Sequence, residues 1–425
     1  MQNNNSLDDD QQVTNRAYVL FILVVVYTFN FIDRQIVGIL AVPIKADLGL
    51  TDSQLGLMGG LAFALFYTGL GIPVAMLADR FSRTWIMTAA LVIWSGMTAA
   101  SGLATNFWQL FAARLGVGVG EAGGVAPAYS LISDFFPPGQ RARAMSVYSF
   151  GIPIGSAIGI VFGGIIASMI DWRWAFFIVG IAGIVIAPIF RMTIKEPPRG
   201  QFDRQREAVK APSLKLILAT LMTKPSFWLL SLGASFSSMM GYGVFFWLPS
   251  FFVRSYNLTL LNASLFYGAV LLIGGLAGIW AGGWLGDRFG QDQRSQYARI
   301  PAIAFLCTVP FYIAAILSPT LTLAFFVLLV PTALGLAWLG PVISAIQHLV
   351  RPDMRATASA IFLFINNLIG IGLGTYAIGA LSDTLAAQFG DESLRYSILA
   401  GTGFYIIAAG LFFLASRWLE QDWED

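Results

Sequence analysis

The chain has 425 residues, of which 57% are hydrophobic and 11% are charged. Soluble domains carry about 25% charged residues, so this composition excludes a soluble globular protein. The net charge of +2 gives no sign of a nucleic-acid partner. The chain has one cysteine, one histidine and no Gly-Lys dipeptide. We therefore expect no disulfide framework, no metal, no phosphate-binding loop and no cofactor.

Twelve segments are apolar and long enough to cross a bilayer, which takes about 20 residues of helix. They lack the period-2 alternation of barrel strands, and lipid leaves helices as the only other way to bond every backbone group. The sequence therefore predicts an all-α membrane protein with twelve transmembrane helices. The predicted spans are 17–43, 54–78, 84–103, 107–133, 141–168, 173–191, 226–252, 261–286, 299–317, 320–349, 355–382 and 396–416.

The basic residues predict the orientation of these helices. With the N-terminus inside the cell, 19 of the 25 lysines and arginines fall on the cytoplasmic side, 4 fall outside and 2 lie within spans. Because cytoplasmic loops are enriched in basic residues, we predict a multi-pass protein of the cell (inner) membrane with both termini in the cytoplasm. The polar stretch 1–16 lacks the features of a signal peptide, and we interpret it and 418–425 as cytoplasmic tails.

Four ionisable residues lie deep in the predicted spans, and all belong to the first and fourth helices: Asp33, Arg34, Arg114 and Glu121. Each costs about 2.5–3.5 kcal/mol at a helix centre, so none is expected to face lipid alone. From the helical rise, Asp33 and Arg114 lie at nearly one depth, close enough for a charge pair. Glu121 lies deeper, on the same face as Arg114 and without an acidic neighbour, while Arg34 is free to pair locally or to face the fourth or fifth helix.

We hypothesise that Asp33 and Glu121 take up and release protons, while Arg34 and Arg114 pair with them or with an anionic group of a substrate. Tyr27 and Asn30, earlier on the first helix, are expected to line the same cavity. The alternative is a set of static ion pairs that fixes helix packing without any titration.

The longest polar stretch, 192–225, is rich in proline and charge and indicates a cytoplasmic linker, with room for a short amphipathic helix. It divides the chain into an N-terminal bundle, 17–191, and a C-terminal bundle, 226–417. The second bundle has no deep charge. Its candidate cavity residues are Tyr242, Phe246, Trp247, Trp338, Asn366 and Asn367, although aromatic residues in membrane helices often serve only packing or lipid contact. A charged half opposite an aromatic half suits an amphipathic solute.

Two loop motifs occur once in each half, at offsets of 208 and 214 residues, which indicates duplication of a six-helix unit. The first half carries Asp79-Arg80 and Pro138-x-x-Arg141-Ala-x-Ala, and the second carries Asp287-Arg288 and Pro352-x-x-Arg355-Ala-x-Ala. The two six-helix bundles are therefore expected to be pseudo-symmetric.

The loop Gly283-x-x-x-Asp287-Arg288-x-Gly290 resembles the loop signature of the major facilitator superfamily, and the resemblance extends over essentially the whole chain. In the first half the same loop has Ala75 where the family has glycine. The fifth helix has Ile160 where an antiporter-associated motif has proline, which favours simple helix packing. The resemblance implies the major facilitator fold and a cytoplasmic gate that latches the inner side. The implied gate residues are Asp79, Arg80, Arg83, Asp134, Arg141, Gly283, Asp287, Arg288 and Arg355.

A narrower resemblance is to the spinster-like branch. It is carried by Tyr27-Thr-Phe-Asn30-Phe-Ile-Asp33-Arg34, by Gly120-Glu121-Ala122 and by Ser133-Asp134-Phe135. Eukaryotic members of this branch export sphingolipid- or lysolipid-like amphiphiles, which implies a substrate of that chemistry.

Together these features predict a monomeric secondary active transporter in the lipid bilayer, moving a small amphipathic, lipid-like organic solute with protons by alternating access. No nucleophile–base set or nucleotide loop points to an enzyme. The alternatives are an organic-anion symporter, a multidrug exporter, or a membrane sensor that binds its ligand without transporting it.

Overall fold

The structure is a computed structural model that describes residues 16–199, 202, 213–289, 294–335, 338–351 and 354–424. The side chains of 138, 139, 142, 279–289 and 356 also lie outside the description. Within these ranges every regular element is a helix. Long apolar runs fold this way because a helix bonds its own backbone groups and leaves only side chains to face lipid.

The N-terminal half contains nine helices that make six membrane crossings. They are α1 (Arg16–Leu48), α2 (Asp52–Gly59), α3 (Leu61–Arg80), α4 (Arg83–Ser101), α5 (Phe107–Glu121), α6 (Val125–Phe135), α7 (Pro138–Ser149), α8 (Gly151–Met169) and α9 (Trp172–Thr193).

The C-terminal half follows the short linker helix α10 (Leu214–Met222). Its helices are α11 (Pro225–Ser255), α12 (Leu260–Phe289), α13 (Gln296–Ile316), α14 (Leu321–Leu334), α15 (Leu339–His348), α16 (Arg355–Phe389), the 3-10 turn η1 (Gly390–Glu392), α17 (Ser393–Gly401) and α18 (Gly403–Asp422).

Each predicted span coincides with one helix or with two consecutive ones. Ten helical stretches of the described residues are long and apolar enough to cross a membrane. One of them, Thr357–Asp422, contains the last two spans, and the fourth span is missed because an interruption divides it into the shorter α5 and α6. These two cases account for the difference from twelve, and the predicted fold class is confirmed.

The outer surface of the bundle is rich in exposed apolar side chains. Phe21, Phe326 and Met192 are 61%, 62% and 82% exposed. Exposed apolar area on this scale is not found on a soluble monomer, and it matches the requirement of a lipid-facing surface.

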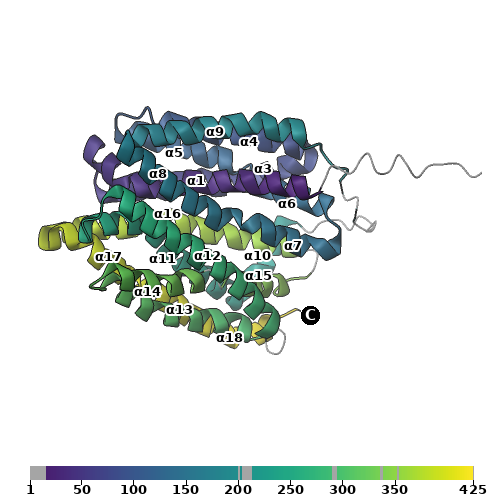
Figure 1. The fold of residues 1–425 in the computed structure, drawn as a ribbon. Coiled ribbons are helices and arrows are strands. Elements are labelled where there is room, and N and C mark those ends of the chain that lie inside the picture. The colour runs from purple at the N-terminus through teal and green to yellow at the C-terminus, as the bar shows by residue number, and fades with distance from the viewer. Residues whose placement is uncertain are drawn as a thin grey trace, which may run out of the picture.

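The two halves lie side by side with their helices running in the same general direction (Figure 1). We call the end that holds α6, α7, α10, α15 and the C-terminus the basic end, and the opposite end, near α17, the far end. Inside each half, α1 packs on α8, α4 on α9, and α11 on both α16 and α18. The halves meet where α2 and α3 contact α16, α8 contacts α12, and α1 contacts α11.

Candidate functional site

The fourth membrane crossing of each half is interrupted near its middle. In the N-terminal half the break between α5 and α6 follows Glu121, where Gly123 and Gly124 donate short-range bonds to the carbonyls of Gly120 and Glu121. In the C-terminal half α14 ends at Leu334 and α15 begins at Leu339. Interrupted helices at matching positions of two repeats mark substrate sites in transporters, because the break leaves polar groups facing a cavity.

Glycines place α5 close to its neighbours and so fix the position of Glu121. A β-carbon on Gly118 would lie 2.5 Å from the Phe63 carbonyl oxygen, and one on Gly120 would lie 2.5 Å from the Trp94 backbone nitrogen. Only glycine permits such contacts between α5 and the backbones of α3 and α4. The acidic side chain that follows is consequently held in the centre of the N-terminal half.

Glu121 forms an ion pair with Arg34 of α1. Arg34 Nε donates to Glu121 Oε2 at 2.7 Å, and the two side chains are 11% and 0% exposed. The rings of Phe31, Phe63 and Tyr67 surround the guanidinium, with centroids 4.6–5.0 Å from its central carbon. The sequence left three partners open for Arg34, and in the structure its partner is Glu121 of the fourth membrane crossing. The two residues form a desolvated ion pair enclosed by aromatic rings.

The predicted charge pair between Asp33 and Arg114 is not formed. The two residues are neighbours, but Arg114 donates to the Asp33 backbone carbonyl at 3.4 Å and not to its carboxylate. Both side chains are buried, at 1% exposure each. Helix geometry could not set the direction of the Asp33 side chain about α1, which the packing of α1 against α8, α9 and α11 decides.

Several polar atoms around this ion pair are buried without a hydrogen-bond partner among the described residues. They are Asp33 Oδ1, Arg34 NH2, Arg114 Nε, Glu121 Oε1 and both amide atoms of Asn30. Buried polar groups normally have partners, because each unmade bond costs about 1–3 kcal/mol. This concentration indicates a site built to bind water, protons or polar ligand groups.

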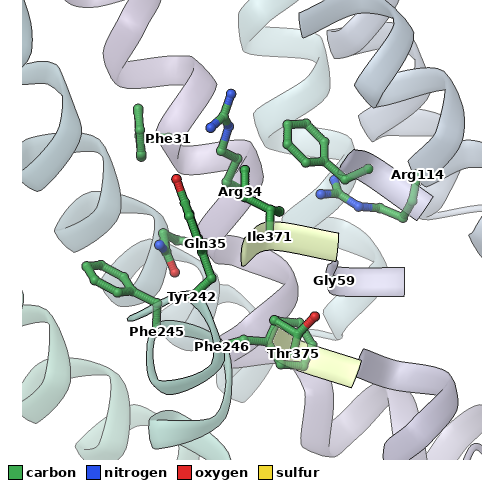
Figure 2. Close-up of a pocket in the computed structure, with 11 residues that line it drawn as sticks. Phe31, Arg34, Gln35, Gly59, Arg114, Tyr242, Phe245, Phe246, Ile371 and Thr375 are labelled. Carbon is green, nitrogen blue, oxygen red and sulfur yellow. The ribbon is translucent and has the colours of Figure 1, made fainter. Parts of the chain in front are cut away.

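A cavity of about 460 Å³ opens beside these groups, and we call it the charged cavity (Figure 2). Arg34 and Arg114 enter it from the N-terminal half, whereas Tyr242, Phe245 and Phe246 enter it from α11. The described residues that line it are Phe31, Arg34, Gln35, Gly59, Phe63, Arg114, Tyr242, Phe245, Phe246, Ile371 and Thr375.

A larger cavity of about 1020 Å³, which we call the aromatic cavity, lies mainly in the C-terminal half. Its rings are Phe31, Tyr242, Phe245, Tyr267, Tyr312, Trp338 and Tyr405, and its polar side chains are Gln35, Ser237, Ser238, Thr332, Asn366 and Asn367. Ser238 donates to Asn366 Oδ1 at 2.9 Å, which fixes one amide against the wall. Among the described residues, its lining contains no aspartate, glutamate, lysine or arginine. The two cavities share Phe31, Gln35, Tyr242 and Phe245.

Three predicted lining residues face neither of these two cavities. Tyr27 stacks on Tyr148 with centroids 4.2 Å apart. Asn30 is buried at 2% exposure beside the ion pair. Trp247 is fully buried and donates to the Thr375 carbonyl at 2.8 Å. Successive helical residues point about 100° apart, so Phe246 faces the charged cavity while Trp247 packs against α16.

The predicted gate residues of the N-terminal half differ in burial and in their partners. Arg83 is 2% exposed and binds the Asp134 carboxylate, and its Nε donates to Glu196 Oε1 at 2.6 Å. Asp79 and Arg80 have exposed side chains. Arg141 donates to the Phe136 carbonyl at 3.1 Å. In the other half Arg355 is partly buried and Gly283 lies in α12, while the side chains of Asp287 and Arg288 lie outside the described residues.

Glu196, which the sequence analysis did not single out, caps the start of α4. It accepts from the Thr84 backbone at 2.9 Å, from Ser82 at 2.9 Å and from Arg83. Burial raises the pKa of the Glu196 carboxyl, but these hydrogen bonds outweigh burial and hold the pKa below its usual range. A depressed folded-state pKa stabilises the protein above the unfolded value, near about 4.3, and this stabilisation is lost as pH falls through the folded value.

We therefore expect Glu196→Gln to lower stability by about 1–2 kcal/mol at neutral pH, the scale of a lost charged hydrogen bond. The difference in melting temperature between wild type and variant is expected to stay constant from pH 7 to about 5 and to shrink as pH falls below about 4, through the folded-state pKa of Glu196. Thermal unfolding in detergent at several pH values measures it. A difference that is constant with pH would show that the charge of Glu196 is not what stabilises this contact.

Comparison with known proteins agrees with this geometry. A family model described as Major Facilitator Superfamily matches residues 23–375. An MFS-type efflux pump of Mycolicibacterium smegmatis is 32% identical over 97% of this chain and 96% of its own length. Protein spinster homolog 1 of Homo sapiens is 28% identical over 87% of this chain and 73% of its own.

Solved structures give the same result. A bacterial homologue of the human lysosomal transporter spinster, crystallised inward-facing and unoccupied, superposes with a TM-score of 0.86 at 34% identity, covering 96% of this chain and 98% of that one. Its inward-facing and occupied form gives 0.82. The fold and the paired cavities thus define a membrane transporter and not an enzyme. The chain belongs to the Major Facilitator Superfamily, and the predicted resemblance to the spinster-like branch is confirmed.

Proposed function

We propose that this protein is a secondary active transporter that carries an amphipathic, lipid-like organic molecule across the cell (inner) membrane by alternating access, coupled to protons. The observation that carries the proposal is the junction of the two cavities, because one presents arginines and the other presents rings, hydroxyls and amides. A molecule with a polar or anionic head and an apolar body matches both at once. A small dianion would leave the larger, uncharged cavity unused.

In this proposal the unpartnered atoms of Arg34 and Arg114 bind the head group. Asp33 and Glu121 exchange protons as the ion pair with Arg34 forms and breaks. Because the substrate head and Glu121 compete for the same guanidinium, binding of one favours release of the other. This competition is a physical basis for coupling substrate movement to a proton.

The contacts between halves at the far end support an inward-facing state, in which that end is closed. The basic end then faces the cytoplasm, as the distribution of lysine and arginine predicts. Arg83 and Asp134 would belong to the cytoplasmic gate in the opposite state. Both bundles and the substrate path come from one chain, so we propose that the monomer is the working unit.

Counterflow in liposomes tests the function. We expect the purified protein to exchange a labelled lysolipid or sphingoid base across the bilayer, with sugar acids as comparison substrates. A sensor would bind the ligand without accumulating it. Exchange of sugar acids alone would favour an organic-anion symporter.

The two carboxylates are tested separately from binding. We expect Asp33→Asn and Glu121→Gln to reduce uptake driven by a pH gradient by about tenfold or more while substrate counterflow continues, because the proton sites are lost and the cavities remain. Asp47→Asn, which removes a half-exposed carboxylate at the far end, is the matched control and should keep coupled uptake. Full pH-driven uptake by both site variants would refute proton coupling and favour static ion pairs.

A second candidate is export of lipophilic drugs, which the 32% identity to the mycobacterial efflux pump and the ring-lined aromatic cavity favour. Expression in a drug-sensitive bacterial host distinguishes it. Raised resistance to lipophilic cations, together with no lysolipid counterflow, would support the exporter.

A further inference from the structure

Asp52, the first residue of α2, joins the two halves at the far end. Arg254 of α11 binds its carboxylate with both terminal nitrogens, each at 2.7 Å. Ser382 of α16 donates to the same group at 2.8 Å, and Lys45 of α1 donates at 2.6 Å. The side chain of Asp52 is only 3% exposed. A carboxylate of one half is therefore enclosed by donors of which most belong to the other half.

Asp383 of α16 makes the reciprocal contact. Its carboxylate accepts from the backbone nitrogens of Asp52 at 3.0 Å and Ser53 at 2.7 Å, and from the Ser53 hydroxyl. These are first-turn amides of α2, which have no partner inside their own helix. Each half thus supplies one carboxylate to donors of the other.

The backbones approach closely behind these carboxylates. A β-carbon on Gly56 would lie 2.5 Å from the Thr375 carbonyl oxygen, and one on Gly60 would collide with Thr375 and Ile371. The contacts recur every four residues: positions 52, 56 and 60, from α2 to the start of α3, lie against positions 379, 375 and 371 of α16 in that order. The residue numbers rise along one partner and fall along the other. This antiparallel seam is continuous with the carboxylate contacts at its outer end.

We propose that Asp52 and Asp383 form a reciprocal clasp that holds the far end closed and sets the ratio of the two states of the transport cycle. The proposal rests on the alternating access of the proposed function. The clasp is suited to repeated opening because it is polar and lies at the membrane surface, where water replaces its bonds on opening. A buried apolar seam alone has no such compensation when it opens to water.

The distance between two spin labels across the far end reports the ratio of states. Cys307 is the sole cysteine and is exposed, so Cys307→Ser gives the background. Leu103 and Leu317, 68% and 55% exposed, follow α4 and α13 at the far end, one in each half, and each is replaced by a labelled cysteine. We expect Asp52→Asn and Asp383→Asn each to raise the population of the longer distance by roughly tenfold, the scale of one or more lost charged hydrogen bonds.

Asp47→Asn is the matched control. Asp47 pairs with Arg173 at the same end but within one half, so its loss should change the ratio less than about twofold. Two variants are used because either alone could fail to fold. Distances unchanged from wild type in the variant or variants that fold would overturn the clasp. Liposome counterflow by the wild type tests the proposed function independently, so a transporting protein with an unchanged ratio refutes the clasp alone.

Discussion

Arg34→Met is expected to lower the stability of the protein by about 3–5 kcal/mol, the usual cost of removing one partner from a buried ion pair. The substitution keeps an apolar side chain of similar length among Phe31, Phe63 and Tyr67, so packing changes little. What it leaves behind is Glu121, at 0% exposure, with no cation at bonding distance. The loss should appear as a large drop in melting temperature in detergent.

The double variant Arg34→Met with Glu121→Gln is expected to recover most of that stability without recovering pH-driven uptake. Replacing both members of a buried pair by neutral groups removes the isolated charge, and the measured effects of the two single changes should therefore not add. Arg395→Met is the control, because Arg395 pairs with Glu392 in a partly exposed i,i+3 arrangement. It should cost no more than about 1 kcal/mol. A double variant as unstable as the sum of the single ones would argue against the pair.

Gly56→Ala is expected to reduce transport by about tenfold or more. The new β-carbon would meet backbone atoms of α16, 2.5 Å from the Thr375 oxygen and 2.8 Å from the Tyr376 α-carbon, and neither can rotate away. Overpacking of this kind costs about 1–3 kcal/mol, and here it destabilises the state in which the seam is closed. Rates in liposomes and the far-end distance measure the effect.

Gly69→Ala is the matched control, since a β-carbon there meets nothing within 4 Å. Alanine in an open helical position is favoured over glycine by about 0.5–1 kcal/mol, so this variant should transport normally and melt no lower than wild type. Equal behaviour of the two alanine variants would show that the seam does not need its close approach.

The far-end contacts of Asp52 and Asp383 could not be predicted from the sequence. Lys45 and Arg254 are two of the four basic residues that the sequence places outside, and the sequence assigned no role to Asp52 or Asp383. The spacing of four between Gly56 and Gly60 was an available signal for close helix packing. The partners of Asp52 and Asp383 in the opposite half lie about 200 or 330 residues away, and nothing local in the sequence identifies them.

By itself the sequence determined the membrane class, the twelve spans, the duplication and the placement of Asp33, Arg34, Arg114 and Glu121 within spans of the N-terminal half. These depend on composition and helical rise, which are local properties of the chain. Tertiary structure alone decided that Arg34 binds Glu121, that Arg114 meets the Asp33 carbonyl, and that Trp247 packs against α16 while Phe246 lines a cavity. The reason is that helix rotation and side-chain direction follow from how neighbouring helices pack, and that packing joins residues far apart in the chain.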